Sequence, residues 1–376
     1  MRVLAAFAGG LGHYRPIAPL ARALAAAGHE VRVACQASAA ARVGADGLAV
    51  VRTRAETAGS VRMSALLPPD PDREDRALRE GYAGRTARSR AHDVLAECRR
   101  RRPDVVLCDE VDFGAMVAAE RLGIPHATVL VMAAGSFVRE DVVGEPLRAL
   151  RAEHGLPDEP PLAMLGRHLV LSPAPPGFRD PAFPLPATAR PLRPSALDAA
   201  ATTRLGTGRP LVYFSLGTVF NLESGDLFGR VLAGLRDLPA DVLVSLGADL
   251  APALLGPQPA NVRVEPYVDQ HAVLARADAV VTHGGSGTVT DALALGVPLV
   301  LLPLGADQPH NARRCADLGV GVVLDPVTVT AAQVRRATAT VLADPVYRRR
   351  AQALRAETAA LPEVGRAVSW LEALAR

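Results

Sequence analysis

A glycine-rich stretch in the second half of the chain has the residue types of a phosphate-binding turn. His283-Gly284-Gly285-Ser286-Gly287-Thr288 follows an apolar run at residues 279–281 and precedes a helical pattern. Such a turn leaves unpaired backbone N–H groups at the positive end of the helix dipole, where a phosphate or diphosphate can bind. The same cluster is also an ordinary helix N-cap, and the stretch alone supports both interpretations equally.

Two ionisable residues in the first half follow apolar runs that predict buried strands. His13 lies in a glycine-rich turn after residues 2–8, and Asp109 directly follows residues 105–108. Asp109 would lie at the carboxyl end of a parallel strand, where open α/β sheets build their sites. It could equally cap the helix predicted after it, and the spacing does not decide between the two.

Two other kinds of site are disfavoured. Gly10-Leu11-Gly12-His13 lacks the third glycine of a dinucleotide-binding turn, and the second strand ends in Cys35-Gln36 rather than in an acid, which argues against a nicotinamide cofactor. Asp70-Pro71-Asp72 matches an Asp-x-Asp metal pattern, but it lies in a proline-rich loop and not at a strand end. We therefore expect neither a cofactor nor a metal.

The composition is that of a large globular protein. With 376 residues, 49% of them hydrophobic and 22% charged, the chain can bury the cores of two domains. The net charge of +3 is small, and aromatic residues (4%) do not interleave with basic ones, which disfavours nucleic-acid binding. The first apolar run is too short for a signal peptide and no run reaches spanning length, so we expect a cytoplasmic protein without stable membrane association.

Predicted strands and helices alternate through both halves of the chain, and a proline-rich stretch at residues 156–194 separates the halves. Among the helices, we expect one at residues 16–27 and a long one at residues 73–102. This rhythm predicts an α/β fold with two doubly wound Rossmann-like domains that face each other across a cleft. The expected boundaries are 1–194 for the first domain, 195–358 for the second and 359–376 for a last helix.

Several short motifs occur in a fixed order along both halves. They are Gly12-His13 with Pro16, Leu216-Gly217-Thr218, Tyr267-Val268-Asp269-Gln270, the stretch from His283 to Thr288 that continues to Gly296-Val297-Pro298, and Asp307-Gln308. Together they resemble glycosyltransferase family 1, and most closely the actinobacterial natural-product glycosyltransferases of the GT-B fold. The resemblance covers nearly the whole chain and implies transfer of a sugar from a nucleotide donor.

The resemblance also implies a donor site. The diphosphate would lie against His283, Gly285, Ser286, Gly287 and Thr288, with Gly12, Thr218 and Val268 in the same site. Asp307 and Gln308 would bind sugar hydroxyls, to which a carboxylate and an amide are suited. Asp291 stands where the family usually has a ribose-binding Glu, and its shorter side chain leaves that contact open. Tyr267 replaces a nucleobase-stacking Trp and could stack or be a core aromatic.

His13 resembles the base of this family, and Asp109 the carboxylate that orients the imidazole, with Asp112 as the alternative partner. A neutral imidazole can take the proton of an acceptor hydroxyl as the oxygen attacks the anomeric carbon. His283 and the helix N-terminus would stabilise the leaving nucleoside diphosphate in place of a metal. Direct displacement would invert the anomeric configuration.

We expect a dTDP- or UDP-linked sugar as donor and a small apolar natural product, such as a polyketide, macrolide or enediyne, as acceptor. The residues that could line the acceptor pocket are Met63, Leu66, Leu67, Phe137 and Val138, although they could simply be core. Three alternatives remain: a lipid-linked GlcNAc transferase, a nucleotide-sugar epimerase, and a non-catalytic partner that activates another transferase. The sequence leaves a monomer and a homodimer open. A hinge between about residues 186 and 208 would let the domains close, and the last helix would return to the first domain.

Overall fold

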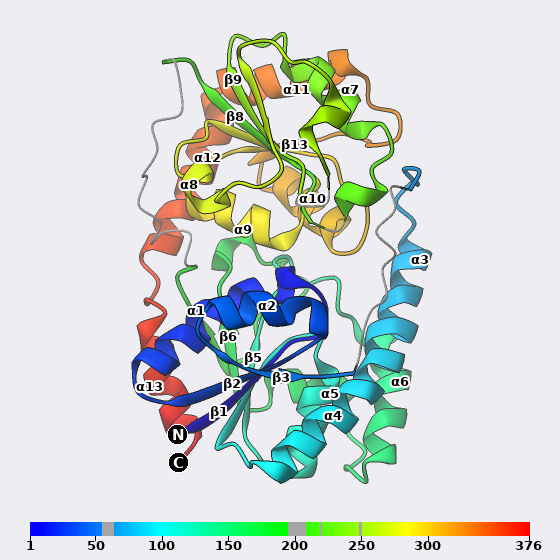
Figure 1. Cartoon of the computed structure of the whole chain (residues 1–376), viewed down its shortest axis with the longest axis vertical. Coiled ribbons are helices and arrows are strands. Elements are labelled where there is room, and N and C mark those ends of the chain that lie inside the picture. The colour runs from blue at the N-terminus through cyan, green and yellow to red at the C-terminus, as the bar shows by residue number, and fades with distance from the viewer. Residues whose placement is uncertain (55–63, 195–207, 219, 248–249) are drawn as a thin grey trace.

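The computed structural model describes residues 1–54, 64–194, 208–218, 220–247 and 250–376. These residues form two α/β domains stacked along the long axis of the molecule, the N-terminal domain below the C-terminal one in Figure 1. The last part of the chain runs along one side of both domains. The predicted fold class, two facing Rossmann-like domains, is confirmed.

The N-terminal domain is built on a parallel sheet that, within the described residues, has seven strands in the order β3-β2-β1-β4-β5-β6-β7. β1 is central because its apolar residues pair on both sides, as when Val3 lies beside both Val31 and Val105. The strands are β1 (Arg2–Ala6), β2 (Glu30–Cys35), β3 (Ala49–Arg52), β4 (Val105–Asp109), β5 (His126–Val129), β6 (Leu169–Ser172) and β7 (Ala189–Pro191).

The C-terminal domain repeats this plan with a parallel sheet of six described strands in the order β10-β9-β8-β11-β12-β13. β11 is buried throughout and pairs with β8 and β12. The strands are β8 (Leu211–Ser215), β9 (Asp241–Ser245), β10 (Val262–Glu265), β11 (Ala279–Thr282), β12 (Leu299–Leu301) and β13 (Gly321–Val323).

Helices cover both faces of each sheet, and several begin at an Asp or Thr whose side chain accepts a backbone N–H of the first turn. The helices are α1 (Leu11–Ala26), α2 (Ala37–Ala45), α3 (Pro71–Arg76), η1 (Ala77–Thr86), α4 (Ala87–Arg100), α5 (Phe113–Arg121), α6 (Glu140–Glu153), α7 (Leu227–Leu235), α8 (Gln270–Leu274), α9 (Ser286–Ala294), α10 (Gln308–Asp317), α11 (Ala331–Ala343), α12 (Pro345–Ala359) and α13 (Gly365–Leu374). Short 3₁₀ turns are η2 (Pro161–Gly166), η3 (Pro176–Phe178), η5 (Phe220–Glu223) and η6 (Pro252–Leu255).

Helix α1 begins at Leu11, earlier than the predicted start at Pro16, so that Pro16 and Pro19 lie inside the helix. Proline has no N–H, and the carbonyls of Gly12 and Arg15 therefore lack their α-helical partners. His13 is thus in the first turn of the helix and not in a loop before it.

The helix predicted at residues 73–102 is observed as three joined segments, α3, η1 and α4. The middle segment is π-helical, a widening that occurs frequently at functional sites. Asp70 caps α3 by accepting the N–H groups of Asp72 and Arg73, which accounts for the Asp-x-Asp pattern without a ligand.

Helix α13 packs against α1 in the N-terminal domain, and its Ala367 and Leu371 share an apolar core with Val3 and Ile17. Helix α12 packs on α9 of the other domain, so the last two helices link the domains. Among the described residues, no helix is both long and apolar enough to cross a membrane.

Candidate active site

His13 and Asp109 lie together at the carboxyl ends of neighbouring strands. His13 is in the first turn of α1, which follows β1, and Asp109 is the last residue of β4, the partner of β1. His13 Nδ1 is 3.3 Å from Asp109 Oδ2, and Asp109 is fully buried. The two atoms are within ion-pair distance, although Nδ1 has no aligned hydrogen-bond partner among the described residues.

Backbone N–H groups hold the Asp109 carboxylate in place. Oδ2 accepts the N–H of Ala8 at 2.9 Å, and Oδ1 accepts those of Val111 at 2.7 Å and Asp112 at 2.8 Å. Three donors from two loops fix both oxygens. Asp109 can therefore orient a neighbouring imidazole without turning away from it.

Asp112 is engaged elsewhere. Its carboxylate forms a buried ion pair with Arg90, whose Nε lies 3.2 and 3.1 Å from the two carboxylate oxygens, and it also caps α5 through the N–H of Ala115. Arg90 further donates to Thr53 Oγ1 at 3.0 Å and to the carbonyl of Ala34 at 3.2 Å. Of the two carboxylates, the structure places Asp109 beside His13 and Asp112 in a structural network.

The surroundings of His13 favour its protonated form. Burial lowers the pKa of the imidazole, but the carboxylates of Asp109, Asp307 and Glu110 outweigh burial and raise the pKa above its ordinary value of 6.5. The ring of Tyr82, from the π-helical segment η1, stacks on the imidazole with centroids 5.9 Å apart. Burial, with the charges of Asp109 and Asp307, raises the pKa of Tyr82 to about 12, so its phenol stays protonated at neutral pH.

The glycine-rich stretch forms the N-terminus of α9, as the sequence predicts. One of its N–H groups is already occupied, because Asp307 Oδ2 accepts the N–H of Ser286 at 3.0 Å and also its hydroxyl. Asn311 donates to the same oxygen at 2.8 Å and to the carbonyl of Gly284 at 3.0 Å. Asp307 thus organises the turn from α10.

Two N–H groups of this turn stay available. Gly287 and Thr288 lie in the first turn of α9, where N–H groups have no intrahelical acceptor. Within the part of the chain that the structure describes, neither N–H has a recorded partner. They can therefore bind an anion.

His283 is packed under the same turn as a neutral imidazole. A Cβ on Gly217 would lie 2.7 Å from its ring, and one on Gly285 would lie 2.6 Å from it, so both glycines are needed for this packing. Burial lowers the pKa of His283 to about 4, although the charge of Asp307 opposes this. The ring carries no charge at neutral pH and can act only as a hydrogen-bond donor or acceptor.

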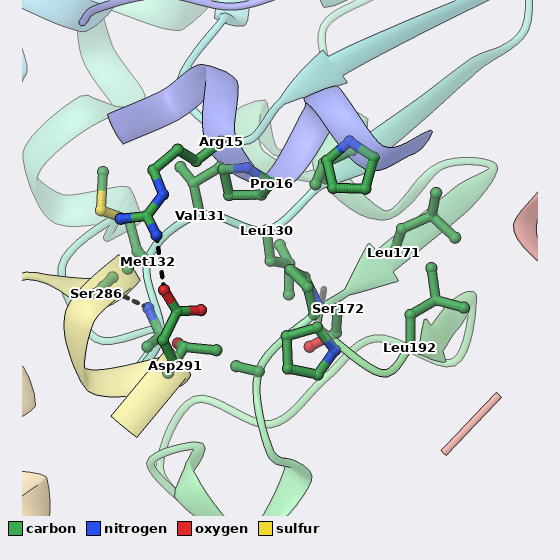
Figure 2. Close-up of a pocket in the computed structure, with 18 of the residues that line it drawn as sticks. Arg15, Pro16, Leu130, Val131, Met132, Leu171, Ser172, Leu192, Ser286 and Asp291 are labelled. Atoms are coloured by element: carbon green, nitrogen blue, oxygen red, sulfur yellow. Dashed lines mark hydrogen bonds and ion pairs between the residues drawn. The ribbon is translucent and has the colours of Figure 1, made fainter. Parts of the chain in front are cut away.

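Asp291, expected at the ribose, makes contacts on both sides of the domain boundary. Its Oδ2 lies 2.8 Å from Arg15 Nη2 of the N-terminal domain, 3.1 Å from Gln270 Nε2 and 3.0 Å from His271 Nε2. The side chain of Arg15 remains 42% exposed. The ion pair between Arg15 and Asp291 joins α1 to α9 (Figure 2).

The other predicted donor-site residues differ in how deeply they are buried. Gln308 is buried, and its Oε1 accepts the N–H of Leu304 at 2.7 Å and that of Gly305 at 3.3 Å. Thr218 is exposed after β8. Tyr267 is 70% exposed, which excludes a core role, and Val268 packs partly on the C-terminal core.

An apolar cavity lies between the domains beside the Arg15–Asp291 pair (Figure 2). It encloses about 850 Å³ of empty space, its open mouth included. Gly12 and Arg15 of α1 and Gly287 and Asp291 of α9 line one end. Most of the other lining residues are apolar, among them Pro16, Pro19, Leu130, Leu171, Leu192 and Val364, and the cations Arg179 and Arg193 also line the cavity.

The four predicted acceptor residues that the structure describes are not among the residues that line this cavity. Phe137 and Val138 are buried in the N-terminal core, and the ring of Phe137 contacts His310. Leu66 packs on the core of the C-terminal domain and Leu67 is 57% exposed. Met63 lies outside the described residues. The apolar character that selected these four described residues reflects core packing and domain contact rather than one pocket.

Three residues at the site have no counterpart in the sequence-based prediction. Arg15 crosses to α9, Tyr82 stacks on His13, and Asn311 holds the glycine turn while accepting the N–H of Ala134 from the N-terminal domain at 3.2 Å. Arg15 and Asn311 each lie close in sequence to a predicted site residue, and this nearness was a usable signal. Tyr82 had none, because its segment carries no motif.

Comparison with known proteins places this geometry in context. Residues 229–374 match the family described as erythromycin biosynthesis protein CIII-like, C-terminal domain. The chain is 30% identical to 4'-demethylrebeccamycin synthase of Lentzea aerocolonigenes, with 99% of each chain covered. It is 31% identical to 10-deoxymethynolide desosaminyltransferase of Streptomyces venezuelae, with 100% of this chain and 97% of that one covered.

Solved structures agree with these sequence matches. The spinosyn rhamnosyltransferase SpnG in complex with thymidine diphosphate superposes with a TM-score of 0.82 at 26% identity, covering 99% of this chain and 100% of that one. The glycosyltransferase SnogD from Streptomyces nogalater superposes with a TM-score of 0.77 at 28% identity, covering 100% and 99%.

Proposed function

This chain belongs to the GT-B glycosyltransferases of macrolide and polyketide antibiotic biosynthesis, and on that premise we propose how it transfers its sugar. The donor is a dTDP- or UDP-linked sugar, and the acceptor is a hydroxyl of a small apolar natural product. The reaction inverts the anomeric carbon and needs no metal, and His13 acts as the general base.

One observation carries this proposal: an imidazole and a fixed carboxylate lie on one domain, and the free N–H groups of a helix N-terminus lie on the other. A base alone could serve many reactions, and an anion site alone could bind any phosphate. Together across a domain boundary they match the needs of displacement at a sugar carbon that carries a diphosphate leaving group.

The proton transfer follows from the orientation of His13. With Nδ1 protonated beside Asp109 Oδ2, Nε2 has a lone pair for the acceptor hydroxyl. As the hydroxyl oxygen forms its bond to the anomeric carbon, the bond between that carbon and the phosphate oxygen breaks, and its electron pair leaves with the diphosphate. The hydroxyl proton goes to Nε2, and Asp109 stabilises the resulting imidazolium.

The leaving group would be received by the C-terminal domain. The free N–H groups of Gly287 and Thr288, at the positive end of the α9 dipole, can bond the phosphate oxygens as their charge develops. Neutral His283 can add a hydrogen bond but no charge. The thymidine diphosphate bound to the relative SpnG supports a nucleoside diphosphate as the product released here.

The proposed activity can be tested on the purified chain. We expect a glycoside to form when the chain is incubated with dTDP- or UDP-linked sugars and a panel of apolar polyketide acceptors. Mass spectrometry would detect the product, and proton coupling constants would give its configuration. A β-linked product from an α-linked donor is expected, whereas an α-linked product would contradict direct displacement.

Removing metal ions should leave the rate unchanged. EDTA is expected to have no effect on initial velocity, since N–H groups and side chains stabilise the leaving group in this proposal. Loss of activity that Mg²⁺ or Mn²⁺ restores would overturn the metal-free mechanism.

The pH dependence should report His13. The pKa of His13 lies above 6.5 because the nearby carboxylates outweigh the effect of burial. Since only the neutral imidazole can accept a proton, kcat/KM should fall as the pH drops through that raised pKa. Asp109→Asn removes a carboxylate that raises this pKa, so the residual activity should decline at a lower pH. The kcat/KM of both enzymes would be measured between about pH 5 and 9. An Asp109→Asn profile with the same midpoint as the unmodified enzyme would argue against the pairing of His13 with Asp109.

Gly9→Ala should impair catalysis through His13. Gly9 has φ +117, and an added Cβ would lie 2.8 Å from Cδ2 and 2.9 Å from Nε2 of the imidazole. We expect kcat to fall by about 10- to 100-fold, because a displacement of roughly 1 Å can cost 10²-fold.

Gly28→Ala is the matched control for Gly9→Ala. Gly28 also has a positive φ of +82, but its Cβ would meet no atom within 4 Å. Both variants should lose about 1 kcal/mol of stability from backbone strain, and only Gly9→Ala should lose turnover. An equal kcat in the two variants would refute the role of this contact.

A further inference from the structure

Arg15 of the N-terminal domain lies beside Gly287 in the anion-binding turn. Its guanidinium reaches from α1 across the domain boundary, with Nη2 2.8 Å from Asp291 Oδ2. Its Nη1 lies 3.8 Å from the position of a Cβ on Gly287, and it is the only neighbour recorded within 4 Å of that position. One nitrogen of the fork therefore holds Asp291, while the other lies beside Gly287 in the first turn of α9.

The charges around the turn require such a cation. Asp307 lies on the N–H of Ser286, and Asp291 lies on the same helix, so two carboxylates flank the place where a diphosphate would bind. His283 contributes no positive charge at neutral pH, since burial lowers its pKa to about 4. Arg15 and the helix N–H groups would together offset the repulsion between a diphosphate and these two carboxylates.

Arg15 also has the chemistry and the freedom to bind phosphate. A guanidinium presents several N–H donors in a plane that matches phosphate oxygens, and it is always charged. The side chain is 42% exposed and lines the interdomain cavity together with Gly287. A phosphate at the N-terminus of α9 could therefore accept hydrogen bonds from Arg15 Nη1 while Nη2 keeps its bond to Asp291.

We propose that Arg15 is a donor-binding residue that supplies, from the N-terminal domain, the positive charge that holds the diphosphate against α9. The inference rests on the proposed function and adds a residue to it. It also makes the diphosphate site a property of both domains, complete only where α1 meets α9.

Nucleotide binding by the purified full-length chain tests this role without any acceptor. We would measure the Kd of dTDP and of UDP by titration calorimetry for the unmodified chain, Arg15→Gln, Arg15→Lys and Arg22→Gln. Arg22 is the matched control because it lies on the same helix, its side chain is 47% exposed, and it pairs with Asp46 at 3.5 Å. Thermal unfolding curves would establish that all variants are folded.

Arg15→Gln should weaken nucleotide binding by about 10- to 100-fold, the range expected for a lost charged hydrogen bond. Arg15→Lys should recover part of this loss, and Arg22→Gln should bind like the unmodified chain. In steady-state assays the donor KM should rise while the acceptor KM stays constant.

Two results would overturn the inference. An unchanged nucleotide Kd in Arg15→Gln would show that Arg15 does not contact the diphosphate. Tighter binding would show that Arg15 only joins the two domains through Asp291 and hinders donor binding. Failure of the unmodified chain to bind either nucleotide is a different result, because it would overturn the proposed function and the inference together.

Discussion

Replacing His13 with alanine is expected to lower kcat by about 10²- to 10⁴-fold, the usual contribution of a positioned general base. The acceptor hydroxyl would then have to lose its proton to water during attack. The affinity for dTDP or UDP should change little, because the side-chain contacts of His13 are with Asp109 and Tyr82 of its own domain. Initial rates at saturating substrates and nucleotide titrations measure the two quantities.

His92→Ala is the control for this substitution. His92 lies on α4 with 66% of its side chain exposed, and its recorded contact is with the neighbouring Asp93. It should retain full turnover. A His13→Ala enzyme that keeps its turnover and remains folded would show that another group takes the proton.

Replacing Arg90 with methionine is expected to lower the free energy of unfolding by about 3–5 kcal/mol, the usual cost of removing one partner of a buried ion pair. Arg90 is 2% exposed and Asp112 is fully buried, so the substitution leaves a carboxylate uncompensated in the core. Thr53 and the carbonyl of Ala34 lose a donor as well. Denaturant unfolding followed by circular dichroism measures the change.

Arg88→Met is the matched control, two residues away on α4. Arg88 pairs with Glu153 at 3.0 Å with both side chains nearly half exposed, so its loss should cost less than about 1 kcal/mol. Equal losses in the two variants would contradict the structural role of the Arg90–Asp112 pair. That role matters for catalysis because it leaves Asp109 as the carboxylate available to His13.

The fold class could be predicted from the sequence because it depends on short-range patterns of apolar and polar residues. Short apolar runs marked the buried strands, and the alternation with helical patterns predicted two parallel sheets. The start of α1 was misplaced because Gly9, Gly10 and Gly12 favour a turn. In the structure, Pro16 and Pro19 lie inside the helix, and Gly12 and Arg15, whose carbonyls lose their α-helical partners, line the interdomain cavity. The π-helical segment η1 leaves no comparable mark in the sequence.

The positions of candidate site residues could be predicted where a motif follows a strand. They could not be predicted where the role of a side chain depends on a residue that is distant in sequence. His13 and Asp109 follow the ends of the paired strands β1 and β4, and the α9 turn follows the end of β11 in the other sheet. The choice between Asp109 and Asp112 depended on Arg90, which is distant in sequence and gives no sign there of being buried. The acceptor residues stay a prediction, since apolar character alone does not separate core from pocket.

The most direct test of the account is the acceptor dependence of nucleotide release. The purified chain would be incubated with a dTDP- or UDP-linked sugar in EDTA, with and without a polyketide acceptor, and the free nucleoside diphosphate would be measured. The account predicts release in proportion to glycoside formed and only when acceptor is present. Release without acceptor, or transfer that requires a second protein, would contradict it.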